Sequence, residues 1–178
     1  MKITSLVLLT AALAVASARG QGIINLPPVP VTNGVTGTLA GSSVLAALYY
    51  GPSDAPADSL SPLVASLALS SGYARFGVVT VPGYLPFTPV EVQIRAWDDS
   101  SGLYPGWPQA QPAWLGGLIA AGESLLVDAI TGSGVLPPSP KAIPGFTISQ
   151  VPEPSSAVLG LLALGLWRAW RARTRRHC

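Results

Sequence analysis

The stretch VEVQIRAW, residues 90–97, decides the fold class that this sequence predicts. Its side chains alternate between two faces of an extended chain: Val90, Val92, Ile94 and Ala96 on one, and Glu91, Gln93, Arg95 and Trp97 on the other. Such alternation is typical of a strand that buries one face in an antiparallel sheet. The residues that follow, DDSSG at 98–102, predict a turn that ends the strand.

Further strands are predicted on both sides of this one. They fall at residues 35–40, 44–50, 75–81, 124–130 and 146–151, each bounded by Gly, Pro, Asn or Ser. This spacing indicates an all-β fold, and we expect a single small antiparallel β-sandwich-like domain at residues 21–150. Residues 62–72 could form a short helix, and residues 115–130 are ambiguous between helix and strand because of their glycines. Proline-rich residues 26–30 and 136–144 are expected to be linkers.

Charge is segregated along the chain and argues against nucleic-acid binding. The 178-residue chain has a formal net charge of +2, but residues 21–150 hold three basic and seven acidic residues, a net charge of −4. The part of the chain that we expect to fold would therefore repel phosphate. The one cysteine, Cys178, excludes an internal disulfide and a cysteine-type zinc site, and His177 beside it does not complete a metal site.

The first 20 residues have the pattern of a secretory signal peptide. Lys2 precedes the apolar run at residues 3–15, and the small residues Ala16 and Ala18 then match a cleavage site. Cleavage is expected after Ala18 or, as the alternative, after Gly20. The competing interpretation, an uncleaved membrane anchor, needs a longer apolar run. The prediction implies the Sec translocon and signal peptidase as partners.

A second apolar run lies near the other end of the chain. The uncharged residues 154–167 would form a helix of about 21 Å, shorter than the roughly 30 Å of a hydrocarbon core. Snorkelling arginines and interfacial tryptophans can extend such a helix, so we expect it to span the membrane with the arginines inside the cell. The alternative is a buried core helix with a basic tail.

The last 28 residues resemble the PEP-CTERM sorting signal of bacterial exported proteins. Three parts occur in order: the triplet Pro152, Glu153 and Pro154; the apolar helix, with Ala157, Leu161, Leu164 and Trp167; and the basic stop, with Arg168, Arg171, Arg173, Arg175 and Arg176. The helix is short, and Trp170, His177 and Cys178 interrupt or follow the basic cluster. The resemblance divides the chain into a signal peptide (1–20), an exported β domain (21–150) and a sorting signal (151–178).

The resemblance also implies a route. The processing partner would be an exosortase, a membrane-embedded cysteine transpeptidase, for which residues 152–154 are substrate. Prolines favour an extended chain there, as a processing site requires. The protein would be held transiently in the inner membrane with its domain outside, and then reach the cell surface or the extracellular space. The pieces LAGSSVLAALYYGP, VEVQIRAWD and LPPSP are similar to an ectodomain found with such tails, chiefly in Verrucomicrobia-type bacteria.

No residue pattern in the middle of the chain indicates a common catalytic site. It has no histidine or cysteine to serve as base or nucleophile. Asp98 and Asp99 could pair with Glu91 or Glu123 as in a glycosidase, or bind calcium together with Ser100 and Ser101. A turn is expected at this position, and aspartates are common in turns for backbone reasons, so we favour the turn over both roles. We expect no enzyme activity, cofactor or metal.

The aromatic residues at 97–114 leave two interpretations open. Trp107 and Trp114 could stack on sugar rings as exposed platforms, or could fill the core. The sequence therefore predicts a non-enzymatic exported surface or extracellular-matrix protein. Its alternatives are a carbohydrate-binding module that takes exopolysaccharide and a small carboxylate-based hydrolase.

Overall fold

The computed structural model describes residues 21–134 and 138–151. In these residues the strands are β1 (Gly22–Leu26), β2 (Val29–Asn33), β3 (Val44–Pro52), β4 (Ser61–Ala68), β5 (Tyr73–Ala74), β6 (Gly77–Val81), β7 (Pro89–Asp98), β8 (Ala121–Glu123), β9 (Val127–Ile130) and β10 (Phe146–Ile148). A 3-10 turn, η1 (Ala57–Ser59), and a helix, α2 (Trp107–Leu115), complete the elements. The prediction of an all-β fold is confirmed.

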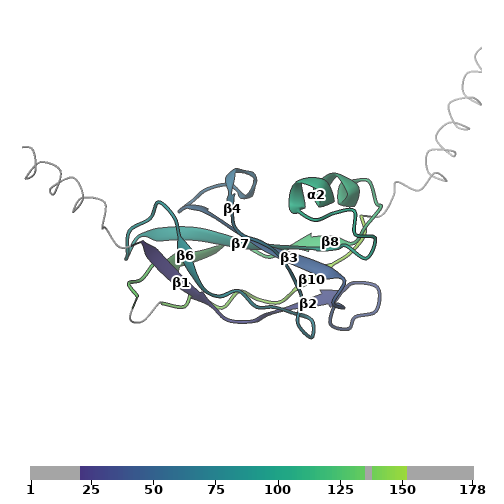
Figure 1. Ribbon diagram of the computed structural model, residues 1–178, viewed down its shortest axis with the longest axis horizontal. Coiled ribbons are helices and arrows are strands. Elements are labelled where there is room, and N and C mark those ends of the chain that lie inside the picture. The colour runs from purple at the N-terminus through teal and green to yellow at the C-terminus, as the bar shows by residue number, and fades with distance from the viewer. Residues whose placement is uncertain (1–20, 135–137, 152–178) are drawn as a thin grey trace, which may run out of the picture.

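The strands form two layers (Figure 1). In one layer β7 lies at the centre, with β3 and then the edge strand β4 on one side and β8 and β9 on the other. The second layer consists of the pair β1–β6 and the set β10–β2–β5. All of these pairings are antiparallel except β10 with β2, which is parallel.

The main core lies between the layers and confirms the alternation predicted for β7. Val90, Val92, Ile94 and Ala96 are each 0 % exposed and belong to one apolar cluster. β1 and β2 contribute Ile24, Leu26, Val29 and Val31 to the same cluster from the opposite layer. Burial of these side chains on both layers is the main force that holds the layers together.

The other face of β7 is also buried, which corrects the prediction of a half-buried strand. Gln93, Arg95 and Trp97 are 4 %, 6 % and 0 % exposed. Helix α2 covers this face (Figure 1) and forms a second apolar cluster with β3 and β8. The helix begins after the extended Gly106, with Pro108 in its first turn, where a proline costs no hydrogen bond. Two prolines in nine residues hid this helix from a sequence prediction.

Several predicted element boundaries are wrong. The strand expected at 35–40 is a turn in which Gly37 has a φ of 69°, and the Asn33 side chain caps it by accepting a hydrogen bond from the Val35 amide. The strand lies earlier, as β2, where a linker was expected. The helix considered at 62–72 is largely the strand β4. The ambiguous segment 115–130 contains β8 and β9, and the strand predicted at 124–130 is confined to β9.

Two predicted elements lie outside the described residues. These are the signal peptide at residues 1–20, with Ala16 and Ala18, and the sorting signal from Pro152 to Cys178. Among the residues that are described, no helix is long and apolar enough to cross a membrane.

Candidate functional site

The end of the β domain is fastened to α2 and β8 immediately before the predicted triplet. The Ser149 amide donates to the Ala121 carbonyl at 3.0 Å, and the Ala121 amide donates back to the Ser149 carbonyl at 3.2 Å. The indole Nε1 of Trp114 donates to the same carbonyl at 2.9 Å. Only Gln150 and Val151 separate this anchor from Pro152.

A glycine makes this fastening possible. Gly122 on β8 lies against the backbone of β10, and a Cβ atom there would collide with the Thr147 carbonyl oxygen. Any larger residue at position 122 must therefore move β10 away from β8. The last strand of the domain is held by close backbone packing as well as by hydrogen bonds.

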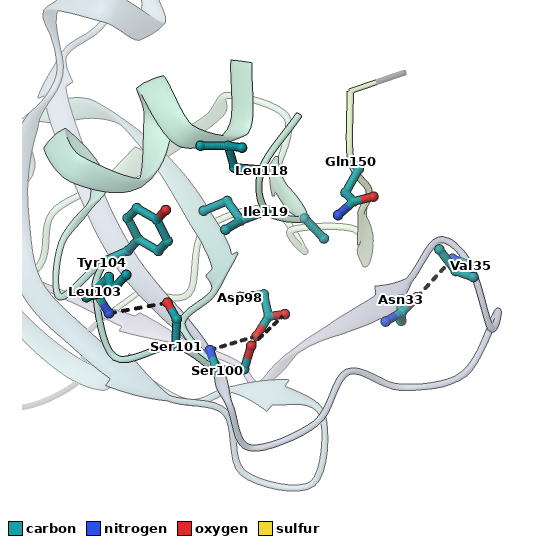
Figure 2. Close-up of a pocket in the computed structure, with 11 residues that line it drawn as sticks. Asn33, Val35, Asp98, Ser100, Ser101, Leu103, Tyr104, Leu118, Ile119 and Gln150 are labelled. Atoms are coloured by element: carbon teal, nitrogen blue, oxygen red, sulfur yellow. Dashed lines mark hydrogen bonds between the residues drawn. The ribbon is translucent and has the colours of Figure 1, made fainter. Parts of the chain in front are cut away.

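A pocket of about 360 Å³ opens beside this anchor (Figure 2). Its polar wall includes Asn33, Asp98, Ser100, Ser101 and Gln150, and its apolar wall includes Val35, Leu103, Tyr104, Leu118, Ile119 and Ala120. Val35, Leu103 and Leu118 are 85 %, 69 % and 70 % exposed. We call these three side chains the exit rim, because they line the same pocket as Gln150, next to the point at which the chain leaves the domain.

Asp98 and Asp99 stabilise the turn that borders this pocket. The Asp98 carboxylate accepts hydrogen bonds from the Ser100 amide at 3.0 Å and from the Ser43 hydroxyl at 3.2 Å. The Asp99 carboxylate accepts one from the Tyr104 amide at 2.7 Å. These contacts assign both aspartates a role in shaping the local backbone of the turn.

The carboxylate pairs that a glycosidase would use are not brought together. Glu91 and Asp98 lie seven residues apart on β7, roughly 23 Å, whereas paired catalytic carboxylates lie about 5–9.5 Å apart. Glu123 is opposite Arg95 in the β7–β8 register and so shares the α2 face with it, while alternation places Asp98 on the other face. Within residues 21–134 and 138–151, no three acidic, histidine or cysteine side chains gather as a metal site.

Arg95 is buried under α2 in an aromatic setting. Its guanidinium lies 4.2 Å from the centre of the Tyr49 ring and 5.5 Å from that of Trp107. Its Nη2 donates to the Ala57 carbonyl at 2.6 Å, and its Nε lies 3.3 Å from Glu123 Oε1. Burial raises the pKa of the Tyr49 phenol above 10.0, an effect that the nearby Arg95 cation partly opposes.

The tryptophans pack mainly as core residues. Trp107 is 3 % exposed, and its ring centre lies 5.9 Å from that of Trp97 and 5.8 Å from that of Trp114. A ring enclosed in this way cannot stack on a sugar without moving α2, so the core interpretation describes Trp107. Trp114 is half-buried, and its indole N–H donates a hydrogen bond to the Ser149 carbonyl.

Phe87 is an exposed aromatic residue that the sequence pattern did not single out. Phe87 is 76 % exposed and has a φ of 64°, a backbone conformation that costs a bulky residue about 1–2 kcal/mol. It precedes β7, so it lies at the far end of the ten-residue strand from Asp98, roughly 30 Å away. The sequence signal was the aromatic between two prolines in LPFTP, residues 85–89.

Thr131 holds the Phe87 loop in place. The Thr131 side chain is fully buried; its hydroxyl donates to the Leu85 carbonyl at 2.6 Å and accepts from the Thr88 amide at 2.9 Å. The Phe87 amide donates to the Thr131 carbonyl at 2.6 Å. These bonds on both sides of Phe87 oppose relaxation of its strained backbone.

A groove of about 480 Å³ runs beside this loop. Its walls are formed by Ser53, Asp54, Pro89, Asp128, Ala129, Ile130, Pro138, Ser139, Pro140 and Lys141. Pro89, which lines the groove, lies two residues along the chain from Phe87, and the groove residue Ile130 precedes Thr131. Apolar surface with a few hydroxyl, carboxylate and ammonium groups is the usual lining of a small-molecule or sugar site.

The geometry thus defines a class of protein: a β domain with an exposed groove at one end and a firmly fastened exit strand at the other. The family model for the PEP-CTERM protein-sorting motif matches residues 150–176, starting one residue after the fastened Ser149. The chain is therefore a protein with a PEP-CTERM sorting signal. Comparisons with curated proteins and with solved structures give no match.

The matched segment includes the positions assigned to the triplet, the apolar helix and the basic stop. It ends at Arg176, before His177 and Cys178. The motif supports export to the cell surface or extracellular space and implies an exosortase as the processing partner.

Proposed function

We propose that this chain is a non-enzymatic exported surface or matrix protein whose β domain is the delivered cargo. Residues 1–20 direct it through the Sec translocon and are removed by signal peptidase. Residues 157–167 hold it in the inner membrane, with Arg168 to Arg176 inside, until the exosortase processes the segment containing Glu153.

One observation carries the proposal: the sorting motif starts where the folded domain ends. The last fastened residue is Ser149, and the family match begins at Gln150. All of β10 lies before the motif, so processing at or after Pro152 leaves the core of the domain complete. This division of the chain is what a cargo with a disposable tail requires.

The test is a blot of tagged protein in its native host. Glu153→Ala should leave the tail attached and retain the protein in the membrane fraction, because the triplet is the processing signal. Asp58→Ala, an exposed carboxylate of the domain, is the matched control and should be processed like the wild type. Normal processing and localisation of Glu153→Ala would remove the sorting account.

A second candidate function is carbohydrate binding, and the groove beside Phe87 favours it. Asp54, Asp128 and Lys141 supply polar groups to the groove, and the exposed Phe87 ring lies two residues along the chain from the groove residue Pro89. Sugars are commonly held by an aromatic face together with directional polar contacts. In this account the groove faces extracellular polysaccharide, away from the processed tail.

Sedimentation of the mature protein with matrix polysaccharide from the host tests this second candidate. Phe87→Asn should abolish co-sedimentation without unfolding the domain, because asparagine tolerates the left-handed backbone. Leu125→Asn changes another side chain that is 70 % exposed and lies outside the groove. Equal binding by wild type and Phe87→Asn would remove Phe87 as the stacking group.

A further inference from the structure

The spacing between the domain and the triplet is short. Ser149 is fixed to β8 and α2, and Pro152 follows three residues later. Three fully extended residues span at most about 11 Å. A compact domain of about 130 residues has a radius of gyration of roughly 14 Å. The chain between Ser149 and the triplet is therefore shorter than the radius of the domain, and the triplet must stay close to the domain surface.

This spacing constrains any enzyme that acts on the triplet. A peptide is bound in an extended form when it is processed, and an extended site of several residues occupies about 3.3 Å per residue. The enzyme's surface must therefore reach within two residues of Ser149. The domain face that surrounds the exit point must then be in contact with the enzyme.

The exit face has the composition of a contact surface. The exit rim places three highly exposed aliphatic side chains around the pocket that Gln150 also lines (Figure 2). The charged side chain that lines this pocket is Asp98, which is already engaged by Ser43 and Ser100. An apolar rim around an open pocket, with little free charge, suits a protein surface that also lies close to a membrane.

We propose that the exit rim, Val35, Leu103 and Leu118, is a docking surface for the membrane-embedded enzyme that processes the triplet. This inference rests on the proposed sorting function and adds a recognition element in the folded domain, outside the motif. The enzyme reads the triplet and also contacts the domain from which the triplet emerges. We choose the processing enzyme as the partner because the short chain between Ser149 and Pro152 brings it against this face of the domain.

The test measures the processing rate of the full chain in its native host by pulse-chase. The double variant Leu103→Gln, Leu118→Gln should be processed about tenfold more slowly, the effect of losing one interface anchor. Leu125→Gln, which is equally exposed but away from the exit, should be processed at the wild-type rate. The melting temperature of the double variant should match that of the wild type, since both side chains are already largely exposed.

A linker insertion makes the test specific. Twelve Gly and Ser residues between Gln150 and Val151 let the enzyme reach the triplet without touching the domain. Wild type and double variant should then be processed at equal rates. A double variant that is processed at the wild-type rate without the linker overturns the inference, and so does one that stays slow with it.

Two further measurements distinguish enzyme contact from lipid contact, and failure of the docking proposal from failure of the sorting function. A photo-crosslinking amino acid at position 118 should yield an adduct with the processing enzyme, whereas an adduct with lipid alone overturns the docking proposal in favour of membrane contact. Glu153→Ala is run in the same assay. If Glu153→Ala blocks processing but the double variant is processed at the wild-type rate, only the docking proposal is wrong. If Glu153→Ala is processed normally, the sorting function itself is wrong.

Discussion

Thr131→Val tests how the exposed ring of Phe87 is held. Valine keeps the shape of the buried threonine but removes its hydroxyl, which donates to the Leu85 carbonyl and accepts from the Thr88 amide. Each hydrogen bond contributes about 1 kcal/mol, and each partner left unpaired in a half-buried position costs up to about 1 kcal/mol more. We therefore expect a loss of about 2–3 kcal/mol in the free energy of unfolding.

Urea unfolding monitored by tryptophan fluorescence measures this loss. At about 4 °C per kcal/mol for a domain of this size, the melting temperature should fall by about 8–12 °C. Thr80→Val is the control, because Thr80 is exposed on β6, and it should change stability by less than about 0.5 kcal/mol. An unchanged free energy of unfolding in Thr131→Val would refute the claim that this hydroxyl holds the loop.

Three more predictions follow from the second core and the exit strand. Arg95→Met should lower the free energy of unfolding by about 3 kcal/mol, because it leaves the Glu123 carboxylate and the Ala57 carbonyl without their partner; denaturant titration measures it, and a loss below 1 kcal/mol would contradict it. The phenolate absorbance of Tyr49, taken as the difference between wild type and Tyr49→Phe, should titrate above pH 10.0. Because the fold favours the neutral phenol, the stability that this group contributes is present below pH 10.0 and is lost as the pH rises through the raised pKa. A titration midpoint at or below 10.0 would be inconsistent with burial of the phenol. Gly122→Ala should destabilise the domain by at least about 2 kcal/mol and speed amide exchange in β10, whereas normal exchange there would show that the close approach is unimportant.

Alternation was sufficient to predict the central strand and its core face. Val90, Val92, Ile94 and Ala96 recur at every second position, and the structure buries all of them between the layers. The pattern did not predict that Gln93, Arg95 and Trp97 would also be buried, because polar side chains on the second face usually indicate solvent. Their burial depends on α2, and its prolines made that segment look like a loop.

The same limit applies to the strands that were misplaced. β2 has the sequence VPVTN, and its proline suggested a linker. The strand tolerates the proline because it pairs with only two short neighbours, β5 and β10. β4 has no charge and no clean alternation, and its pairing with β3 contains register shifts, so helix and strand were hard to separate. In both cases tertiary pairing decides the local structure.

The candidate sites divide in the same way. The sorting signal was readable from sequence because its parts are contiguous, and the family match covers them. The pocket beside the exit combines residues 33–35, 98–104, 118–120 and 150, and the groove combines residues from four separate segments. No local pattern links such residues. The exposure of Phe87 depends on Thr131, 44 positions later in the chain.

The intact mass of the mature protein from its native host tests the central claim most directly. The account predicts a species that begins after Ala18 or Gly20, retains the whole β domain through Gln150, and has lost residues beyond the processed triplet. Recovery of a mature surface form that still carries residues 152–178 would contradict it.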